Sequence, residues 1–282
     1  YLPDGEWMFS RYQYRNAGKL SNRGWAFSLD AAVFSKNKLE WTTGLRFSTC
    51  QSKVLQIDSR ESEEIYLFSP DAFDFPTSYY DALVIAAGHE PGLFETYQFD
   101  GVDENGNWKF ADLDGDNILH EYQGDRHELT TLPNSELGLH QSLRWGRFDL
   151  QAWVRGVFGH RLLNGYRHKL EDKHVVPWRN VVKTDRFLDQ LESPGNPFSD
   201  YFLEKASFLK LDYLALGYRH PLKNGSIRLY LAARNLLTFS NYQGVDPEPR
   251  LENEGETYVS GIERGDTYFP ARTVAVGVEF SF

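Results

Sequence analysis

The sequence predicts an all-β protein in which an antiparallel sheet forms part of a transmembrane β-barrel. Three observations lead to this class. Apolar and polar residues alternate along many stretches, with the period of two that is typical of strands. The connections between these stretches alternate between short and long. Aromatic residues make up 15% of the chain, as expected where aromatic girdles meet the two membrane interfaces.

The last stretch, residues 271–282, shows the alternation most clearly. One side begins with Arg272 and is otherwise apolar, whereas the other side is small or polar and carries Glu279. In a membrane barrel the apolar side of such a strand contacts lipid, and in a soluble protein it packs against a core. The apolar residues are Val274, Val276, Val278, Phe280 and Phe282.

Six of eight further stretches show the same alternation, whereas 81–87 is a weaker strand that turns into 93–100, so we expect about nine strands in all. Within 207–219 the apolar positions change from odd to even numbers, which predicts a β-bulge near Tyr213. The polar side of nearly every stretch carries a charged residue. The eight stretches are 22–34, 39–50, 81–87, 93–100, 137–145, 148–158, 207–219 and 227–239.

The lengths of the connections favour a barrel over a soluble adhesin or lectin sandwich, which is the alternative. If consecutive strands pair, all short turns lie at one end of the sheet and all long loops at the other. Outer-membrane barrels have this arrangement, with short periplasmic turns and long extracellular loops, and the C-terminus would then be periplasmic. The short connections are 35–38, 88–92, 145–147 and 220–225, and the long ones are 56–79, 101–133, 161–206 and 241–269.

Composition and motifs argue against several classes of function. The net charge of −10 argues against nucleic-acid binding, and one cysteine, Cys50, allows neither an internal disulfide nor a cysteine zinc cluster. The 8 histidines lack the spacing of a zinc protease. No nucleophile elbow, P-loop or dinucleotide-binding fingerprint is present. We therefore expect no enzymatic activity.

An acidic stretch in one long connection has the spacing of a calcium loop. Carboxylates at alternate positions followed by a backbone carbonyl are ligands that Ca²⁺ prefers. The stretch departs from an EF-hand, which needs Gly where Asn117 stands and Glu where Gln123 stands. We expect a structural Ca²⁺ ion, and an Asp-rich turn without an ion is the alternative. The expected ligands are Asp112, Asp114, Asp116, Asp125 and the carbonyl oxygen of Ile118.

Five stretches together resemble the SusC/RagA-type TonB-dependent transporters of Bacteroidetes, in the order in which that family has them. Three departures concern loops and ligand contacts: Arg234 replaces a glutamine, 159–161 lacks the usual Gly-Asn-Asp, and 129–138 replaces a Gly-Asn-Pro segment. The stretches are NAGKLSNRGWAFSLDAAVF (16–34), YQFDGVDENGNWKFADLDGDN (97–117), SFLKLDYLALGYRHPL (207–222), IRLYLAARNLLTFSNYQGVDPE (227–248) and YFPARTVAVGVEFSF (268–282).

The resemblance implies the C-terminal part of a barrel of roughly 22 strands, so that 1–282 is one segment of a barrel domain. A plug domain, a TonB box and a signal peptide are expected outside this chain. The family implies TonB-driven uptake of oligosaccharides or oligopeptides across the outer membrane, with a SusD-like surface lipoprotein as a lid. Expected partners are the remaining barrel and plug, this lipoprotein, TonB and outer-membrane lipid. A barrel that has lost transport and serves as a scaffold in an envelope assembly is the alternative.

The same reading assigns side chains to the lumen, the membrane interface and the loops. Five arginines are expected to face the lumen, either as a charged wall for the plug or as ordinary lumen polarity. Three tryptophans, Trp25, Trp41 and Trp145, are expected near the short-turn ends, in an aromatic belt or packed on a neighbouring strand. Loop aromatics are expected to stack on sugars or to pack on the lid. The arginines are Arg46, Arg144, Arg155, Arg228 and Arg234, and the loop aromatics are Tyr79, Tyr80, Tyr166, Trp178, Tyr242 and Tyr258.

Overall fold

The computed structural model is an all-β structure in which one long antiparallel sheet dominates. Among the described residues, no helix has the length and apolarity needed to cross a membrane. The structure describes residues 16, 18–57, 64–67, 83–119, 124–176, 178, 180–182, 190–248, 261–263 and 268–282.

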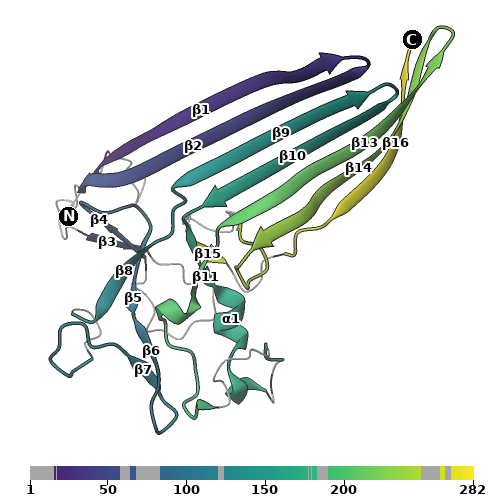
Figure 1. Cartoon of the computed structure of the whole chain (residues 1–282). Coiled ribbons are helices and arrows are strands. Elements are labelled where there is room, and N and C mark those ends of the chain that lie inside the picture. Colours follow the sequence, from purple (N-terminus) through teal and green to yellow (C-terminus); the bar gives the residue numbers. More distant parts are fainter. Residues whose placement is uncertain are drawn as a thin grey trace, which may run out of the picture.

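Seven strands make the long sheet, which we call the wall, and each pairs antiparallel with its neighbours (Figure 1). The strands have between 9 and 19 residues, and about 9–11 tilted residues suffice to cross a membrane. In spatial order they are β1 (Gly18–Lys36), β2 (Leu39–Ile57), β9 (Ser135–Trp145), β10 (Phe148–Phe158), β13 (Phe208–Leu222), β14 (Gly225–Ser240) and β16 (Thr273–Ser281).

The expected number of about nine wall strands is wrong for the described part of the chain. The stretches 81–87 and 93–100 give β4 (Leu83–Ala86) and β5 (Leu93–Tyr97), which belong to a separate four-stranded sheet. With 4 and 5 residues they are too short to cross a membrane. Neither strand lies between β2 and β9 in the wall, because β2 pairs directly with β9. The remaining strands of the small sheet are β3 (Glu64–Leu67) and β8 (Arg126–Thr130).

The wall sorts its connections by length, as predicted, but 88–92, expected as a short turn of the wall, instead joins β4 to β5 beside the loop end of β2. Tight turns join β1 to β2, β9 to β10, and β13 to β14, and all three lie at one end of the wall (Figure 1). The described parts of the connections between β2 and β9, between β10 and β13, and between β14 and β16 lie at the other end (Figure 1). The C-terminus lies at the turn end (Figure 1).

The two faces of the wall differ in chemistry. On one face, which we call the apolar face, large side chains are exposed, and Val276 of β16 is 80% exposed. The opposite face, the charged face, carries ion pairs between strands. An exposed apolar face on a large sheet is the property expected of a surface in contact with lipid.

The predicted bulge in β13 is confirmed, because the register between β13 and β14 shifts between Leu211 and Tyr213.

Trp25 lies at the opposite end of the wall from the turn end, where it was expected. Trp41 and Trp145 lie close to the turns, where Trp145 pairs with both Leu39 and Phe148. Trp25 instead pairs with Thr49, near the loop end of the hairpin, and is 86% exposed. The reason is the length of β1, which has 19 residues and ends at its turn with Lys36. The apolar face therefore has tryptophans near both ends.

The long connections fold into a body of their own, which we call the loop body. Its short elements are β6 (Phe99–Val102), β7 (Trp108–Phe110), β11 (Arg161–Asn164), α1 (Gly165–Leu170), β12 (Leu203–Lys205) and β15 (Ile262–Glu263), with 3₁₀ turns at Lys173–Val175 and Asp200–Phe202. Asn164 caps α1 by accepting a hydrogen bond from the Arg167 N–H.

The largest cluster of buried apolar side chains lies in the loop body rather than in the wall. Phe94 and Phe202 are fully buried, and they come from different connections. Ile262, from the third connection, packs against the same cluster. Because all three connections contribute, the loop body is a packed unit and not a set of independent loops.

Candidate functional site

A network of ion pairs crosses the charged face close to the turns. Glu40 of β2 lies opposite Arg144 of β9, which lies opposite Asp149 of β10. Arg228 of β14 binds Asp149 through two nitrogens and lies 3.5 Å from Glu279 of β16. We call these five residues the turn-end cluster. Negative and positive charges alternate along it, so each arginine lies between two carboxylates and the five residues carry a net charge of −1.

The pair of Asp149 and Arg228 joins two strands that are not neighbours. Gly217 of β13 lies between them, paired with Asp149 on one side and with Tyr230 on the other. A Cβ atom at Gly217 would lie 2.5 Å from the Asp149 carboxylate and 2.7 Å from the Arg228 Nε. The missing side chain therefore makes the room in which the two charged groups meet.

The five arginines expected in the lumen all lie on the charged face. The register places Arg46 and Arg155 opposite Gly138 from its two sides, and Arg144 follows Gly138 by an even number of residues. Arg46 binds Asp30 at 2.7 Å, and the Arg234 guanidinium lies 5.9 Å from the centre of the Tyr213 ring. Whether this face lines the lumen of a closed barrel is still a prediction.

A second cluster of charges lies at the loop end of the charged face. Arg155 of β10 binds Asp212 of β13 at 2.8 Å and also binds both carboxylate oxygens of Glu248. Lys210 of β13, which is buried, binds Asp246 at 2.7 Å and Glu248 at 3.1 Å. These five residues form the loop-end cluster. It attaches the segment 241–248 to the wall by charge-assisted hydrogen bonds.

Burial raises the pKa values of the glutamates in and beside this cluster, whereas hydrogen bonds lower them. Burial favours the protonated form of Glu248, but hydrogen bonds from Arg155 and Lys210 outweigh it and hold its pKa below the ordinary value. Burial raises the pKa of Glu263, although the Asp246 N–H and the Tyr242 hydroxyl donate to its carboxylate. Glu263 thus ties β15 to the same segment.

A buried network of charges joins the elements of the loop body. Arg167 of α1 binds Glu171 at 2.7 Å and Glu204 at 2.6 Å, and its side chain is 3% exposed. The Tyr201 hydroxyl donates to Glu171, and the Asn164 amide donates to Glu204. A buried arginine needs such partners, because an uncompensated charge in this place is costly.

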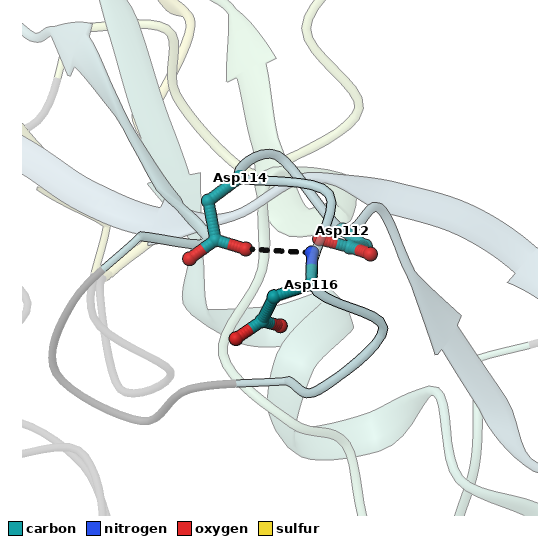
Figure 2. Close-up of side chains that lie close together, drawn as sticks. All are labelled: Asp112, Asp114 and Asp116. Atoms are coloured by element: carbon teal, nitrogen blue, oxygen red, sulfur yellow. Dashed lines mark hydrogen bonds between the residues drawn. The ribbon is translucent and has the colours of Figure 1, made fainter.

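The acidic loop brings together three of the expected calcium ligands. The carboxylate oxygens of Asp112, Asp114 and Asp116 lie within 4.8 Å of one another (Figure 2). Asp112 also accepts hydrogen bonds from the N–H groups of Gly115 and Asn117. Figure 2 shows the hydrogen bond from the Asp116 N–H to Asp114, at 3.2 Å. The loop is therefore a compact turn held by its own carboxylates.

The fourth carboxylate and the expected carbonyl belong to the same loop. Asp125 is buried and accepts a hydrogen bond from the Leu113 N–H, whereas the Ile118 N–H donates to Asp116. A hydrogen bond from Asp116 lowers the pKa of Asp114, but desolvation and the charges of Asp116, Asp125 and Asp112 outweigh it and raise that pKa. Crowded carboxylates of this kind attract a cation, and the prediction of Ca²⁺ is still untested.

The loop aromatics divide into different environments. Trp178 is 88% exposed, and Tyr166 lies against Phe269 with a ring distance of 6.3 Å. The expectation for Tyr242 is wrong, because this side chain is buried and its hydroxyl donates to Glu263. Tyr79, Tyr80 and Tyr258 lie outside the described residues.

Several known proteins are similar in sequence to this chain over nearly its whole length. No protein-family model matches. A protein named TonB-dependent receptor P3, from Formosa agariphila, is 24% identical over 304 residues, covering 96% of this chain and 29% of that protein. TonB-dependent receptor SusC from Bacteroides thetaiotaomicron is 23% identical and covers 97% of this chain and 28% of that protein.

The solved structure of the RagAB peptide transporter has the same fold. Its TM-score is 0.69 at 21% sequence identity, and the match covers 96% of this chain and 30% of that one. The chain is therefore similar to a segment of the SusC/RagA-type TonB-dependent transporters. This SusC/RagA-like segment spans less than a third of the length of these relatives.

The sequence reasoning missed the residues that hold the SusC/RagA-like segment together at its loop end. Lys210 is a cation on the polar side of a strand, and it was not distinguished from other lumen charges. Asp246 and Glu248 lie in a stretch that carried the family resemblance, at alternate positions of GVDPE. Their pairing with Lys210 needs the fold, since about 36 to 38 residues separate the partners along the chain.

Proposed function

We propose that this segment forms part of the barrel of an outer-membrane TonB-dependent importer. The sheet with an exposed apolar face and length-sorted connections supports this proposal most strongly. A soluble sandwich would bury those side chains against a second sheet. The names of the relatives, TonB-dependent receptors and SusC, support the same function.

The proposed cargo is an oligosaccharide or an oligopeptide. One structure with the same fold is titled a peptide transporter, and the charged face supplies hydrogen-bonding groups for polar cargo. In the proposed orientation the loop body is extracellular and lies beneath a SusD-like lipoprotein lid. The turns and the C-terminus are periplasmic, and TonB acts through a plug and a TonB box that belong to other parts of the protein.

The proposal includes a structural Ca²⁺ ion in the acidic loop. Three clustered carboxylates support it, and the buried Asp125 lies beside them in the same loop. The ion would tie 112–118 to 124–125, where a Cβ atom at Gly124 would lie 2.2 Å from Asp114. The ion would hold an extracellular loop in shape and would take no part in moving cargo.

Fractionation and uptake together test the function. The full-length protein should be found in the outer-membrane fraction, and it should co-purify with a surface lipoprotein after detergent extraction. Its deletion should abolish growth on one class of oligosaccharide or oligopeptide, and the intact gene should restore it. Recovery of native protein in the soluble fraction would refute the membrane assignment. Membrane recovery with a normal lid but no uptake of any cargo would refute import.

A further inference from the structure

Three basic side chains lie together on the apolar face of the hairpin of β1 and β2. In β1 the odd-numbered residues from Lys19 through Arg23 to Trp25 share one face. Lys53 of β2 pairs with Ser21, which lies between the two cations of β1, so Lys53 is on the same face. All three cations are exposed. Diagonal neighbours on a sheet have Cα atoms about 7–8 Å apart, so one small ligand can reach all three.

Among the residues that the structure describes, this group of cations has no acidic neighbour on its own face. The nearby positions on that face are Ser21, Trp25, Thr49, Gln51 and, beyond a register shift, Gln56 opposite Lys19. Within the described residues, no ion pair involves any of the three cations, whereas Arg46 and Arg144 on the other face are both paired. Like charges on neighbouring strands repel one another unless an anion lies between them.

The position along the wall places the three cations at an edge of the membrane. Trp145, near the turns, pairs with Leu39, and Trp25 pairs with Thr49, so ten residues of β2 separate the levels of the two tryptophans. Ten residues of strand, tilted by roughly 40°, rise about 25 Å, which is the height of an outer apolar band. Arg23, Lys53 and Lys19 lie two, four and six residues further, or roughly 5, 10 and 15 Å above that band, so they extend from the level of the lipid headgroups towards the outside.

We propose that Lys19, Arg23 and Lys53 bind the phosphate group of an anionic lipid in the leaflet at the loop end of the wall. A phosphate offers several oxygens to three converging cations, and its acyl chains lie along the apolar face beneath. Exposed Trp25 marks the boundary between the two parts of the lipid. The inference rests on the proposed function for its outer-membrane location, which makes this leaflet the external one.

The test uses the full-length transporter purified in detergent and stripped of lipid. Native mass spectrometry measures binding of monophosphoryl lipid A, with phosphatidylcholine as the zwitterionic comparison. The test variant is K19Q/R23Q/K53Q, and K53Q alone is a milder second variant. The control is K36Q/K38Q/K223Q, which removes the same charge from exposed lysines at the turns. Heat-modified gel mobility shows whether each variant is folded.

The parent protein should bind lipid A more tightly than phosphatidylcholine, and the triple variant should lose roughly tenfold to a hundredfold in affinity. K53Q should lose roughly threefold to fivefold, and the control should stay within about twofold of the parent. Inorganic phosphate at millimolar concentration should compete weakly, since it lacks the acyl chains. Full competition by phosphate would show a free-anion site instead of a lipid site.

Two outcomes would overturn the inference while leaving import intact. Equal losses in the test and control variants would show non-specific attraction. Unchanged binding in the triple variant would show that the cations serve another partner, such as an acidic residue of a strand beside β1. Uptake of cargo, measured in the same variants, is expected to be retained. Recovery of the full-length protein in the soluble fraction would instead refute the proposed function.

Discussion

Asp149 and Arg228 meet across a strand that contributes no side chain to their contact. Their strands, β10 and β14, flank β13, and Gly217 is the residue beneath the pair. Both charged side chains are only 16% exposed, and the Arg228 Nη2 lies 2.5 Å from the Asp149 carboxylate. A mostly buried pair of this kind favours the order and register of these three strands, because breaking it would leave a charge without its partner.

Replacing Gly217 by alanine should therefore weaken the wall. The new Cβ atom would displace one of the charged groups, and we expect a loss of about 1–3 kcal/mol in the free energy of unfolding in lipid or detergent. Urea titration of the folded barrel measures it. Gly138→Ala is the matched control, because its Cβ atom would make an ordinary contact of 3.5 Å with Arg46. Equal stability of both variants would contradict this account.

Lys210 should control the attachment of the segment 241–248. Lys210→Met leaves Asp246 and Glu248 without one of their cations, so we expect faster hydrogen exchange in this segment, equivalent to a local loss of about 2–4 kcal/mol. Lys109→Met is the control, because its pair with Asp100 is more than half exposed and such pairs contribute little. Unchanged exchange after Lys210→Met would show that other contacts hold the segment.

The acidic loop should bind Ca²⁺ through its clustered carboxylates. Terbium luminescence, with displacement of terbium by Ca²⁺, measures this directly in the chelator-treated protein. Asp114→Asn should weaken binding by roughly tenfold or more, because one charged ligand is lost. Asp103→Asn is the control, since Asp103 holds a similar turn through Asn105 and Asn107 but has no place in the cluster. Terbium binding that is equal in the parent protein and Asp114→Asn would refute the site.

The loop body should lose stability on acidification because of a buried histidine. Burial lowers the pKa of His168 to about 3, although a hydrogen bond involving Asn196 opposes this. The unfolded chain, with a pKa near about 6.5, binds the proton first. Stability is therefore unaffected by this group above about pH 6.5, and it falls as the pH drops from there towards 3.

Hydrogen exchange in the loop body at pH 7 and pH 5 measures this dependence after correction for the intrinsic exchange rate. His168→Phe should flatten it, since phenylalanine has no proton to bind and fits beside Phe202, whose ring lies 4.9 Å from that of His168. His174→Gln is the control, because His174 is half-exposed and contacts Asp172 near the surface. An identical pH dependence in the parent protein and His168→Phe would contradict the assignment.

The wall was largely predictable because its signal is local. Each wall strand has nine or more residues, and the bulge near Tyr213 shifts the apolar phase visibly in the sequence. The stretches 81–87 and 93–100 are shorter than those of the wall, and the strands that form in them, β4 and β5, have only 4 and 5 residues. Length was the signal that separated them from the wall strands, since only long strands cross a membrane.

The loop body could not be predicted, because its contacts are not local. Phe94 and Phe202 share one cluster although they lie in different connections, and Arg167 meets Glu204 from a distant strand. The five arginines of the charged face were recognised as a set, but their pairing depends on which strands are neighbours. The Asp149–Arg228 pair also needed Gly217 beneath it, which no periodicity reveals.

The account depends most on the claim that the apolar face of the wall contacts lipid. Nitroxide labels at position 276 or 275 of the full-length protein, in a Cys50→Ser background and in lipid vesicles, test it directly by their collision rates with oxygen and with a polar nickel complex. Oxygen, which dissolves in lipid, should reach the label at Val276, and the nickel complex should reach the label at Ala275 on the opposite face. A label at Val276 that neither reagent reaches, or no difference between the two positions, would contradict the membrane wall.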